Sequence, residues 1–133
     1  MQFNQYNKIF TKGRNETRPF LYFCFMTKKN RILQTIKIRL NSVFNDRIAD
    51  VVLFGSQAKN TSNRNSDFDI LIVTSDLFTW QERGQIRDLC YEVSLDFDIL
   101  IDSKIISRPE IETKFWGKHP LITDALSYGI HAR

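Results

Sequence analysis

Two short apolar runs separated by a polar stretch constrain the fold of this chain more than any other feature. The first run is Ile48 to Phe54 and the second is Ile70 to Val73. Short runs rich in valine and isoleucine, bounded by glycine and aspartate, are typical of strands buried on both faces. The sequence therefore predicts two strands of one sheet, joined by a polar segment that begins at Gly55 and ends at Asp69.

Helices are expected before and after these strands. Apolar residues at the spacing of one helical face predict a helix at about 28–45 and another at about 79–92. A third apolar run at about 97–101 predicts a third strand, and the tail is expected to form two short helices broken at about 117–120. Strands alternating with helices predict an α/β (α+β) domain with a small mixed sheet.

Length, composition and charge indicate one globular domain with a basic extension. The chain has 133 residues, of which 42% are apolar and 26% charged, as in soluble proteins. A change in composition predicts an N-terminal extension of unknown role at 1–25 and a domain at 26–133, with Met26 as a hypothetical original start. Residues 1–31 contain seven Lys or Arg against Glu16 alone (+6), and residues 32–133 contain 12 against 14 acids (−2), which gives +4. The domain itself is therefore not expected to bind nucleic acid, although the basic extension could contact nucleic acid or another polyanion.

The cysteines and the apolar segments indicate the cellular compartment in which the protein is expected. Cys24 and Cys90 are far apart and lack the spacing of metal ligands, so reduced thiols in a cytoplasmic protein are expected. The apolar run from Phe20 to Met26 is much shorter than the ~20 residues that a membrane-spanning helix needs. No membrane partner is predicted.

Two aspartates at the end of the polar segment predict a metal site. Side chains alternate along a strand, so Asp67 and Asp69 should point the same way, with Cα atoms about 6.6 Å apart. Neighbouring carboxylates repel unless protons or cations neutralise them, and Mg²⁺ prefers such oxygen ligands. Two ions about 3.5–4 Å apart can activate an attacking oxygen and stabilise a leaving one. Two Mg²⁺ ions are therefore expected here.

The dipeptide Gly55-Ser56 predicts a phosphate site at the other end of the same segment. Glycine lets the backbone approach an oxyanion, and the following N–H groups and hydroxyl can bind phosphate. A helix that opens at Ser56 would add a favourable dipole. Phosphate beside metal implies a nucleoside triphosphate as substrate. A third acid would sit next to the incoming hydroxyl and accept its proton.

Taken together, Gly55-Ser56, ten further residues and Asp67-Phe68-Asp69 resemble the minimal nucleotidyltransferases (MNT family) of the DNA polymerase beta superfamily. The similarity continues through the apolar run at 70–73, the acid and apolar residues at 98–101, and the tail at 119–130. It covers the chain from Met26 to its end.

The resemblance implies a role for each residue of the motif. Gly55-Ser56 would hold the triphosphate, and Asp67 and Asp69 would be paired catalytic metal ligands. The third catalytic carboxylate and metal ligand falls on Asp98, which precedes an apolar triplet. Asp96, two residues earlier on the same expected face, is its rival.

Two positions depart from the family pattern. Gln57 stands where an arginine is often found, and Asn60 stands where a glycine commonly closes the next turn. Lys59 could replace the missing cationic contact with phosphate as a point charge. Neither departure removes a metal ligand, but weaker binding of the triphosphate is a consequence to test.

The resemblance also implies a reaction and a partner. AMP would pass from ATP to a hydroxyl, and pyrophosphate would be released. Minimal nucleotidyltransferases often form toxin–antitoxin pairs with a small helical HEPN protein. In these pairs the HEPN protein is the toxin, the nucleotidyltransferase is the antitoxin, and the acceptor is a tyrosine of the toxin. The oligomeric state is left open.

Other functions remain as alternatives or are excluded by the residues. A catalytically weak binding module could neutralise a partner by contact alone. Transfer to a small molecule would want a second helical region or a dimer to build the acceptor pocket. A serine hydrolase is not expected, because Ser56 lacks the Gly-x-Ser-x-Gly pattern.

Overall fold

The computed structural model describes residues 26–59 and 67–133. The chain divides into two units, Met1–Arg31 and Ile32–Arg133, and every strand described here belongs to the second. The predicted division into an extension at 1–25 and a domain at 26–133 stays a prediction. The elements in chain order are α3 (Lys28–Phe44), η1 (Asn45–Arg47), β1 (Ile48–Phe54), α4 (Gly55–Ala58), β2 (Phe68–Thr74), α5 (Trp80–Phe97), β3 (Ile101–Ser107), α6 (Arg108–Ile111), η2 (Trp116–Lys118), α7 (Pro120–Tyr128) and β4 (Ile130–His131).

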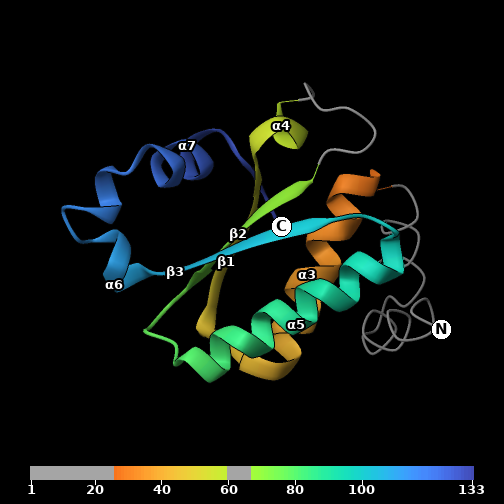
Figure 1. Ribbon diagram of the computed structural model, residues 1–133, viewed down its shortest axis with the longest axis horizontal. Helices are drawn as coiled ribbons and strands as arrows, with labels where there is room; N and C mark the ends of the chain where they lie inside the picture. The colour runs from red at the N-terminus through yellow and green to blue at the C-terminus, as the bar shows by residue number, and fades with distance from the viewer. Residues whose placement is uncertain (1–25, 60–66) are drawn as a thin grey trace, which may run out of the picture. The chain divides into compact units, whose positions relative to one another are not determined.

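The described strands form one mixed sheet in the order β3-β2-β1-β4. β1 and β2 are antiparallel neighbours, β4 pairs with the other side of β1, and β3 runs parallel to β2. A parallel neighbour requires a crossover connection, which α5 provides. The end of β1 and the starts of β2 and β3 therefore lie at the same end of the sheet, where Figure 1 shows α4. The predicted mixed sheet of an α/β (α+β) fold is confirmed.

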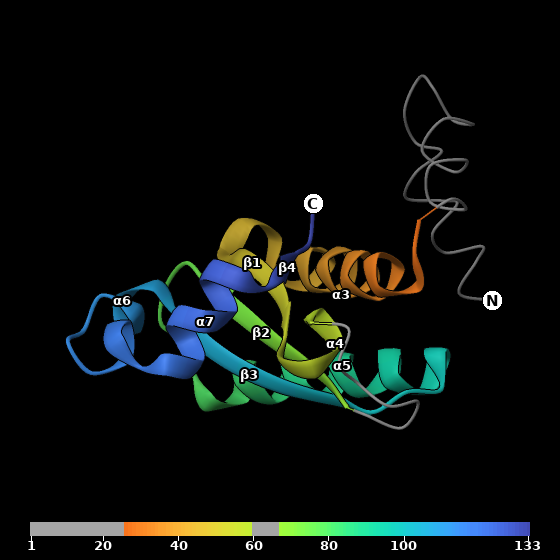
Figure 2. The ribbon, with the colours of Figure 1, turned by 90° about the horizontal axis from the view of Figure 1, so that it is seen from above.

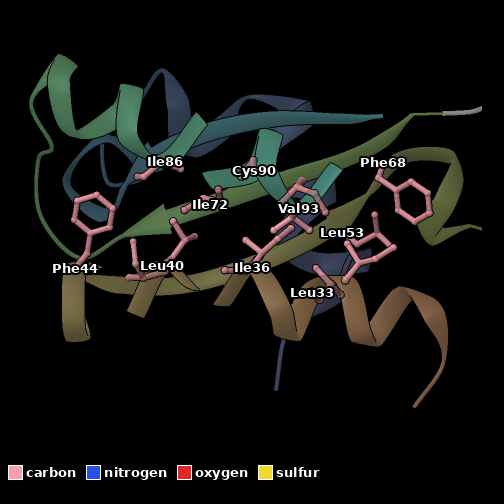
Figure 3. Packing of buried hydrophobic residues seen from close by; sticks show 14 of the residues in the cluster. Leu33, Ile36, Leu40, Phe44, Leu53, Phe68, Ile72, Ile86, Cys90 and Val93 are labelled. Atoms are coloured by element: carbon pink, nitrogen blue, oxygen red, sulfur yellow. The ribbon is translucent and has the colours of Figure 1, made fainter. Parts of the chain in front are cut away.

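One face of the sheet packs against α3 and α5. Because strand side chains alternate, Leu53 of β1 and Ile72 of β2 turn to this face and are fully buried. Figure 3 shows them between Ile36 and Leu40 of α3 and Val93 of α5. This layer is the larger of the two hydrophobic clusters among the described residues.

The other face packs against α7, and this face also carries the candidate site. Val52 and Leu71 turn toward it and contact a smaller cluster with Ile122 and Ala125 of α7. Figure 2 shows α7 over this side of the sheet. Asp69 has the same strand parity as Leu71, so its carboxylate lies on the α7 face.

Most of the predicted elements are confirmed. The helix expected at 28–45 is α3, and β1 has the predicted bounds. The tail forms two short α-helices, but the break between them is wider than predicted, because α6 ends at Ile111, η2 occupies Trp116–Lys118 and α7 begins at Pro120. As predicted, Pro109 lies in the first turn of α6 and Gly129 ends α7.

The third strand is a correction. The sequence predicts a strand at about 97–101, but α5 continues to Phe97 and β3 begins only at Ile101. The helix continues because Val93 and Phe97 keep facing the hydrophobic cluster. It ends at Asp98, which adopts the left-handed conformation with φ 53°. Aspartate tolerates this conformation better than most residues.

Candidate active site

Gly55 makes a sharp turn at the end of β1, and the space beside it requires glycine. Its φ is +71°, in the left-handed region that favours glycine. A Cβ on Gly55 would lie 2.4 Å from Oδ2 of Asp69. The backbone of Gly55 therefore passes directly against the Asp69 carboxylate. Figure 1 shows α4 at the end of β1, where this turn lies. Ser56 follows in the first turn of α4, so a short helix does begin at this turn.

The strand register brings a third acid to Asp69, and this acid is Asp102. In the parallel pairing of β2 and β3, Asp69 is the partner of Asp102. Directly paired residues project from the same face of a sheet. Asp67 immediately precedes β2 and shares the parity of Asp69, so the two predicted aspartates and Asp102 meet at one end of the sheet.

The electrostatics of Asp69 reflect this gathering of carboxylates. Burial, followed by the negative charges of Asp102 and Asp67, raises the pKa of Asp69 above its ordinary value. The charge of Lys104 opposes this rise. Like charges that raise a pKa in this way mark a site that a cation would stabilise.

Lys104 is the cation beside these acids. Its Nζ lies 3.1 Å from both carboxylate oxygens of Asp102, two residues earlier on the same strand face. Both side chains are about half exposed, so this ion pair contributes little to folding stability. The ion pair offsets part of the negative charge in the protein without bound metal.

Asp98 and Asp96, the two acids proposed for the third position, lie elsewhere. Asp98 is the exposed C-cap of α5, four positions before the residue that pairs with Asp69. Asp96 lies on α5, where its carboxylate accepts a hydrogen bond of 2.5 Å from the buried Arg39 of α3. The expectation that Asp98 stands on a strand beside the pair is wrong, because α5 extends through that segment. Asp96 has a structural role between two helices.

A sequence signal for Asp102 existed, but at the far end of its strand. Ser107 and Glu110 form a capping box at the start of α6, with hydrogen bonds in both directions. Because a Ser-x-x-Glu pattern marks a helix start, it places the end of the preceding strand at Ser107. A strand of ordinary length then begins near Ile101 and includes Asp102.

The remaining predicted nucleotide ligands lie around the turn at Gly55. Lys59 is the exposed C-cap of α4, and its backbone N–H donates to Gly55 O. Gln57 is buried, and Asn60 lies outside the described residues. A cavity of about 250 Å³ opens between α4 and α7, lined by Gly55, Lys59, Asp124 and Tyr128 among others.

The donor set suits a hard divalent cation, although the described side chains do not form a closed metal site. No group of three His, Cys, Asp or Glu side chains within 26–59 and 67–133 is arranged to hold a metal ion. The three carboxylates nevertheless suit a cation, because they meet at one end of the sheet and the charges of Asp67 and Asp102 repel that of Asp69. Carboxylate oxygens are the ligands that Mg²⁺ prefers.

This fold and this arrangement of acids define a nucleotidyltransferase. Residues 34–123 match the family described as Polymerase beta, Nucleotidyltransferase. That match covers more than half of the 133 residues, and the chain belongs to this family. It is an enzyme of the nucleotidyltransferase class.

Two curated relatives come from the archaeon Methanocaldococcus jannaschii, and each is named as a candidate protein adenylyltransferase. One is 32% identical over 99 residues, which cover 74% of this chain and 93% of the relative. The other is 32% identical over 81 residues, which cover 60% of this chain and 76% of the relative.

Solved toxin–antitoxin structures are also similar to this chain. A mutant of the MntA–HpeT toxin–antitoxin has a TM-score of 0.49 at 18% identity, covering 79% of this chain and 72% of that one. A toxin–antitoxin with AMP-PNP has a TM-score of 0.48 at 19% identity, covering 74% and 70%. Among the described helices of this chain, none is long and apolar enough to cross a membrane.

Proposed function

We propose that this nucleotidyltransferase transfers AMP from ATP to a hydroxyl group of a protein and releases pyrophosphate. The observation that carries the proposal is the pairing of Asp69 with Asp102 beside the glycine turn at Gly55. The choice of AMP and of a protein acceptor is supported by the names of the two archaeal relatives.

The proposed reaction is an in-line displacement at the α-phosphorus. The acceptor hydroxyl oxygen forms a bond to the α-phosphorus while the bond from that phosphorus to the bridging oxygen breaks, so pyrophosphate leaves. The turn at Gly55-Ser56 binds the triphosphate with its backbone N–H groups and hydroxyl. Asp102 lies on an edge strand, where an acceptor can reach it, and takes the hydroxyl proton. Lys59 offers a cationic contact to phosphate.

Asp67, Asp69 and Asp102 would hold the divalent metal. Bound there, two Mg²⁺ ions would neutralise the carboxylates and the developing charge on the phosphate oxygens. In this assignment Asp102 replaces Asp98 as the third carboxylate, because the register places it next to Asp69. Asp98, at the end of α5, has no catalytic part in the mechanism.

The cavity of about 250 Å³ beside Gly55 is the proposed place of the nucleoside. It continues from the phosphate turn toward α7, where the exposed ring of Tyr128 offers a stacking surface for a base. Aromatic stacking on a base contributes about 1–3 kcal/mol. Ala58 of α4 and Leu121 and Ala125 of α7 give the cavity an apolar wall.

Isothermal titration calorimetry with ATP and MgCl₂ tests the nucleotide site. Wild-type protein is expected to bind ATP only with the metal, and Asp67→Ala and Asp69→Ala are expected to weaken binding at least ten-fold. Asp88→Ala, which removes an exposed aspartate from α5, is the matched control and should bind as wild type. Equal ATP binding by all four proteins would contradict the assignment.

Transfer is tested with radiolabelled ATP and the product of the adjacent gene. The proposal includes a toxin–antitoxin role, in which that product is a small helical HEPN protein and the acceptor is its tyrosine. Label on a tyrosine of that protein supports the toxin–antitoxin role. Transfer that persists in Asp67→Ala and Asp69→Ala would contradict the proposed reaction. The cytoplasm as location stays a prediction, supported by the cysteine pattern.

A binding module without catalysis is the competing proposal. Gln57 is buried and supplies no cationic side chain to phosphate, so weak catalysis would fit this alternative. It predicts that affinity for the partner persists when Asp67 and Asp69 are both replaced. A pull-down with the doubly substituted protein, alongside the transfer assay, separates the two proposals.

A further inference from the structure

β3 is an edge strand, and among the described residues its outer side is open along the part that carries Asp102. The sheet order places β3 at one side of the sheet, and among the described residues no strand pairs with its outer edge. The neighbouring β2 is almost completely buried, whereas β3 is only partly covered from Ile101 to Ile105. Figure 2 shows β3 at the margin of the sheet.

Hydrogen bonds show which backbone groups of β3 turn outward. Leu100 O accepts from Phe68 N at 2.8 Å on the β2 side, and Ile105 O accepts from Arg83 Nη1 at 3.3 Å. Because backbone groups alternate along a parallel strand, those of Ile101, Ser103 and Ile105 face away from β2. Arg83 covers the carbonyl of Ile105, so the groups left without a partner in 26–59 and 67–133 are those of Ile101 and Ser103. They flank Asp102.

A groove of about 510 Å³ begins at Ser103 and continues along the second half of β3 to Ile106. Its charged side chains are Arg83, Arg87 and Lys104 against Glu110. Arg83 and Glu110 neutralise each other in an ion pair, and Lys104 is paired with Asp102. Arg87 is the remaining charge of the groove, and it is positive. Trp116 and His119 add an aromatic wall, with ring centroids 5.5 Å apart. The groove therefore matches an acidic ligand with apolar or aromatic side chains.

We propose that the acceptor is an extended, acidic segment of a protein that pairs with β3 at Ile101–Ser103 as an additional strand. This inference rests on the proposed function and names the acceptor class. Neighbouring strands lie about 4.8 Å apart and paired side chains share a face. A hydroxyl-bearing residue opposite Asp102 then presents its oxygen to that carboxylate, which takes the proton as the oxygen bonds to the α-phosphorus and pyrophosphate leaves.

Charge reversal at Arg87 tests the groove. Arg87 is an exposed residue of α5 that lines the groove and has no ion pair among the described side chains. Arg87→Glu is expected to lower kcat/KM for an acidic acceptor at least five-fold, with a smaller effect at high salt. Lys37→Glu on α3 makes the same change of charge at another helix and serves as its control.

A proline at residue 103 tests the strand pairing. The N–H of Ser103 faces outward, so proline preserves the pairing of β3 with β2 while it blocks an added strand. Ser103→Ala keeps the N–H and measures the loss of the hydroxyl alone. The proline variant is expected to lose at least ten-fold more transfer activity than the alanine variant. Circular dichroism and ATP calorimetry show that both variants keep the fold and the nucleotide site.

The probes are a random Glu/Tyr copolymer, a Lys/Tyr copolymer and an RNA oligonucleotide with a free 3′-hydroxyl, each with labelled ATP and Mg²⁺. Label on the Glu/Tyr copolymer, together with slower hydrogen exchange at the amides of Ile101 and Ser103, supports the inference. Label on RNA alone, equal label on both copolymers, or unchanged exchange at these amides overturns it while the proposed function stands. Failure to bind ATP overturns both.

A second copy of the chain is the other candidate for this edge. If β3 pairs with β3 of another molecule, sedimentation velocity will show a dimer that Ser103→Pro dissociates, and the Glu/Tyr copolymer will not bind. That result overturns the inference.

Discussion

The carboxylate of Asp69 occupies the space where a side chain at residue 55 would lie, so only glycine fits at residue 55. A Cβ added at residue 55 would lie 2.4 Å from Oδ2 of Asp69, which is shorter than any real contact of that kind. A side chain at residue 55 therefore either displaces the carboxylate or changes the turn. The backbone conformation at residue 55 and the position of the Asp69 carboxylate are therefore coupled.

Gly55→Ala is expected to abolish nucleotide binding with only a modest loss of stability. The left-handed φ costs an alanine roughly 1–2 kcal/mol, and the added methyl group displaces Asp69. Urea denaturation measures the stability, and calorimetry with ATP and Mg²⁺ measures the binding. Ala58→Gly in the same turn is the control for a small change in α4. Normal ATP affinity in Gly55→Ala would show that the carboxylate is free to move.

Asp69→Asn is expected to raise the stability of the metal-free protein at neutral pH. Burial and the charges of Asp102 and Asp67 raise the pKa of Asp69, so the folded state binds this proton more tightly than the unfolded state. The folded state then gains stability as pH falls through the raised pKa, and ionisation costs stability above it. In EDTA the variant should melt a few degrees higher at pH 7, about 2 °C, and the gain should shrink toward pH 4. Asp88→Asn should show no such gain.

The positions at which α5 ends and β3 begins determine whether Asp98 or Asp102 lies beside Asp67 and Asp69. Asp98 adopts φ 53° at the C-cap, a conformation in which glycine avoids a cost of roughly 1 kcal/mol. Asp98→Gly is therefore expected to keep or raise stability by about 0.5–1 kcal/mol and to keep transfer activity. Asp102→Asn should lose activity at least a hundred-fold. If Asp98→Gly lost activity while keeping wild-type stability, the third carboxylate would have to be assigned to Asp98 instead of Asp102.

At the level of elements, most of the fold could be predicted, because apolar patterns report burial directly. The run from Ile48 to Phe54 predicts β1 with its bounds, and Asp67 and Asp69 mark the start of β2. The third carboxylate could not be placed from the apolar pattern, since the last turn of α5 continues without a break into the residues before β3. The Ser107–Glu110 capping box indicates where the third strand ends, but only the pairing register, a tertiary property, places Asp102 directly beside Asp69.

At the scale of the whole domain, the reactivity of the Cys90 thiol measures how readily α5 separates from β3. It is 2% exposed, and burial raises its pKa to about 12 against a weaker opposing hydrogen bond from Ser103. In a Cys24→Ser background, a thiol reagent should modify Cys90 only as fast as the protein opens. The labelling rate should rise with urea in parallel with unfolding. Rapid labelling of the native protein would mean that β3 separates from α5 without unfolding.

The crossover through α5 also has a consequence for the order of folding. Antiparallel β1 and β2 can pair locally, whereas β3 pairs with β2 only after the whole of α5 has been placed. Until that step, Asp102 is far from Asp69 and their repulsion is absent. The electrostatic cost of bringing Asp102 beside Asp69 therefore falls on the docking of β3. Acid and divalent cations should speed this late step and leave the β1–β2 hairpin unaffected.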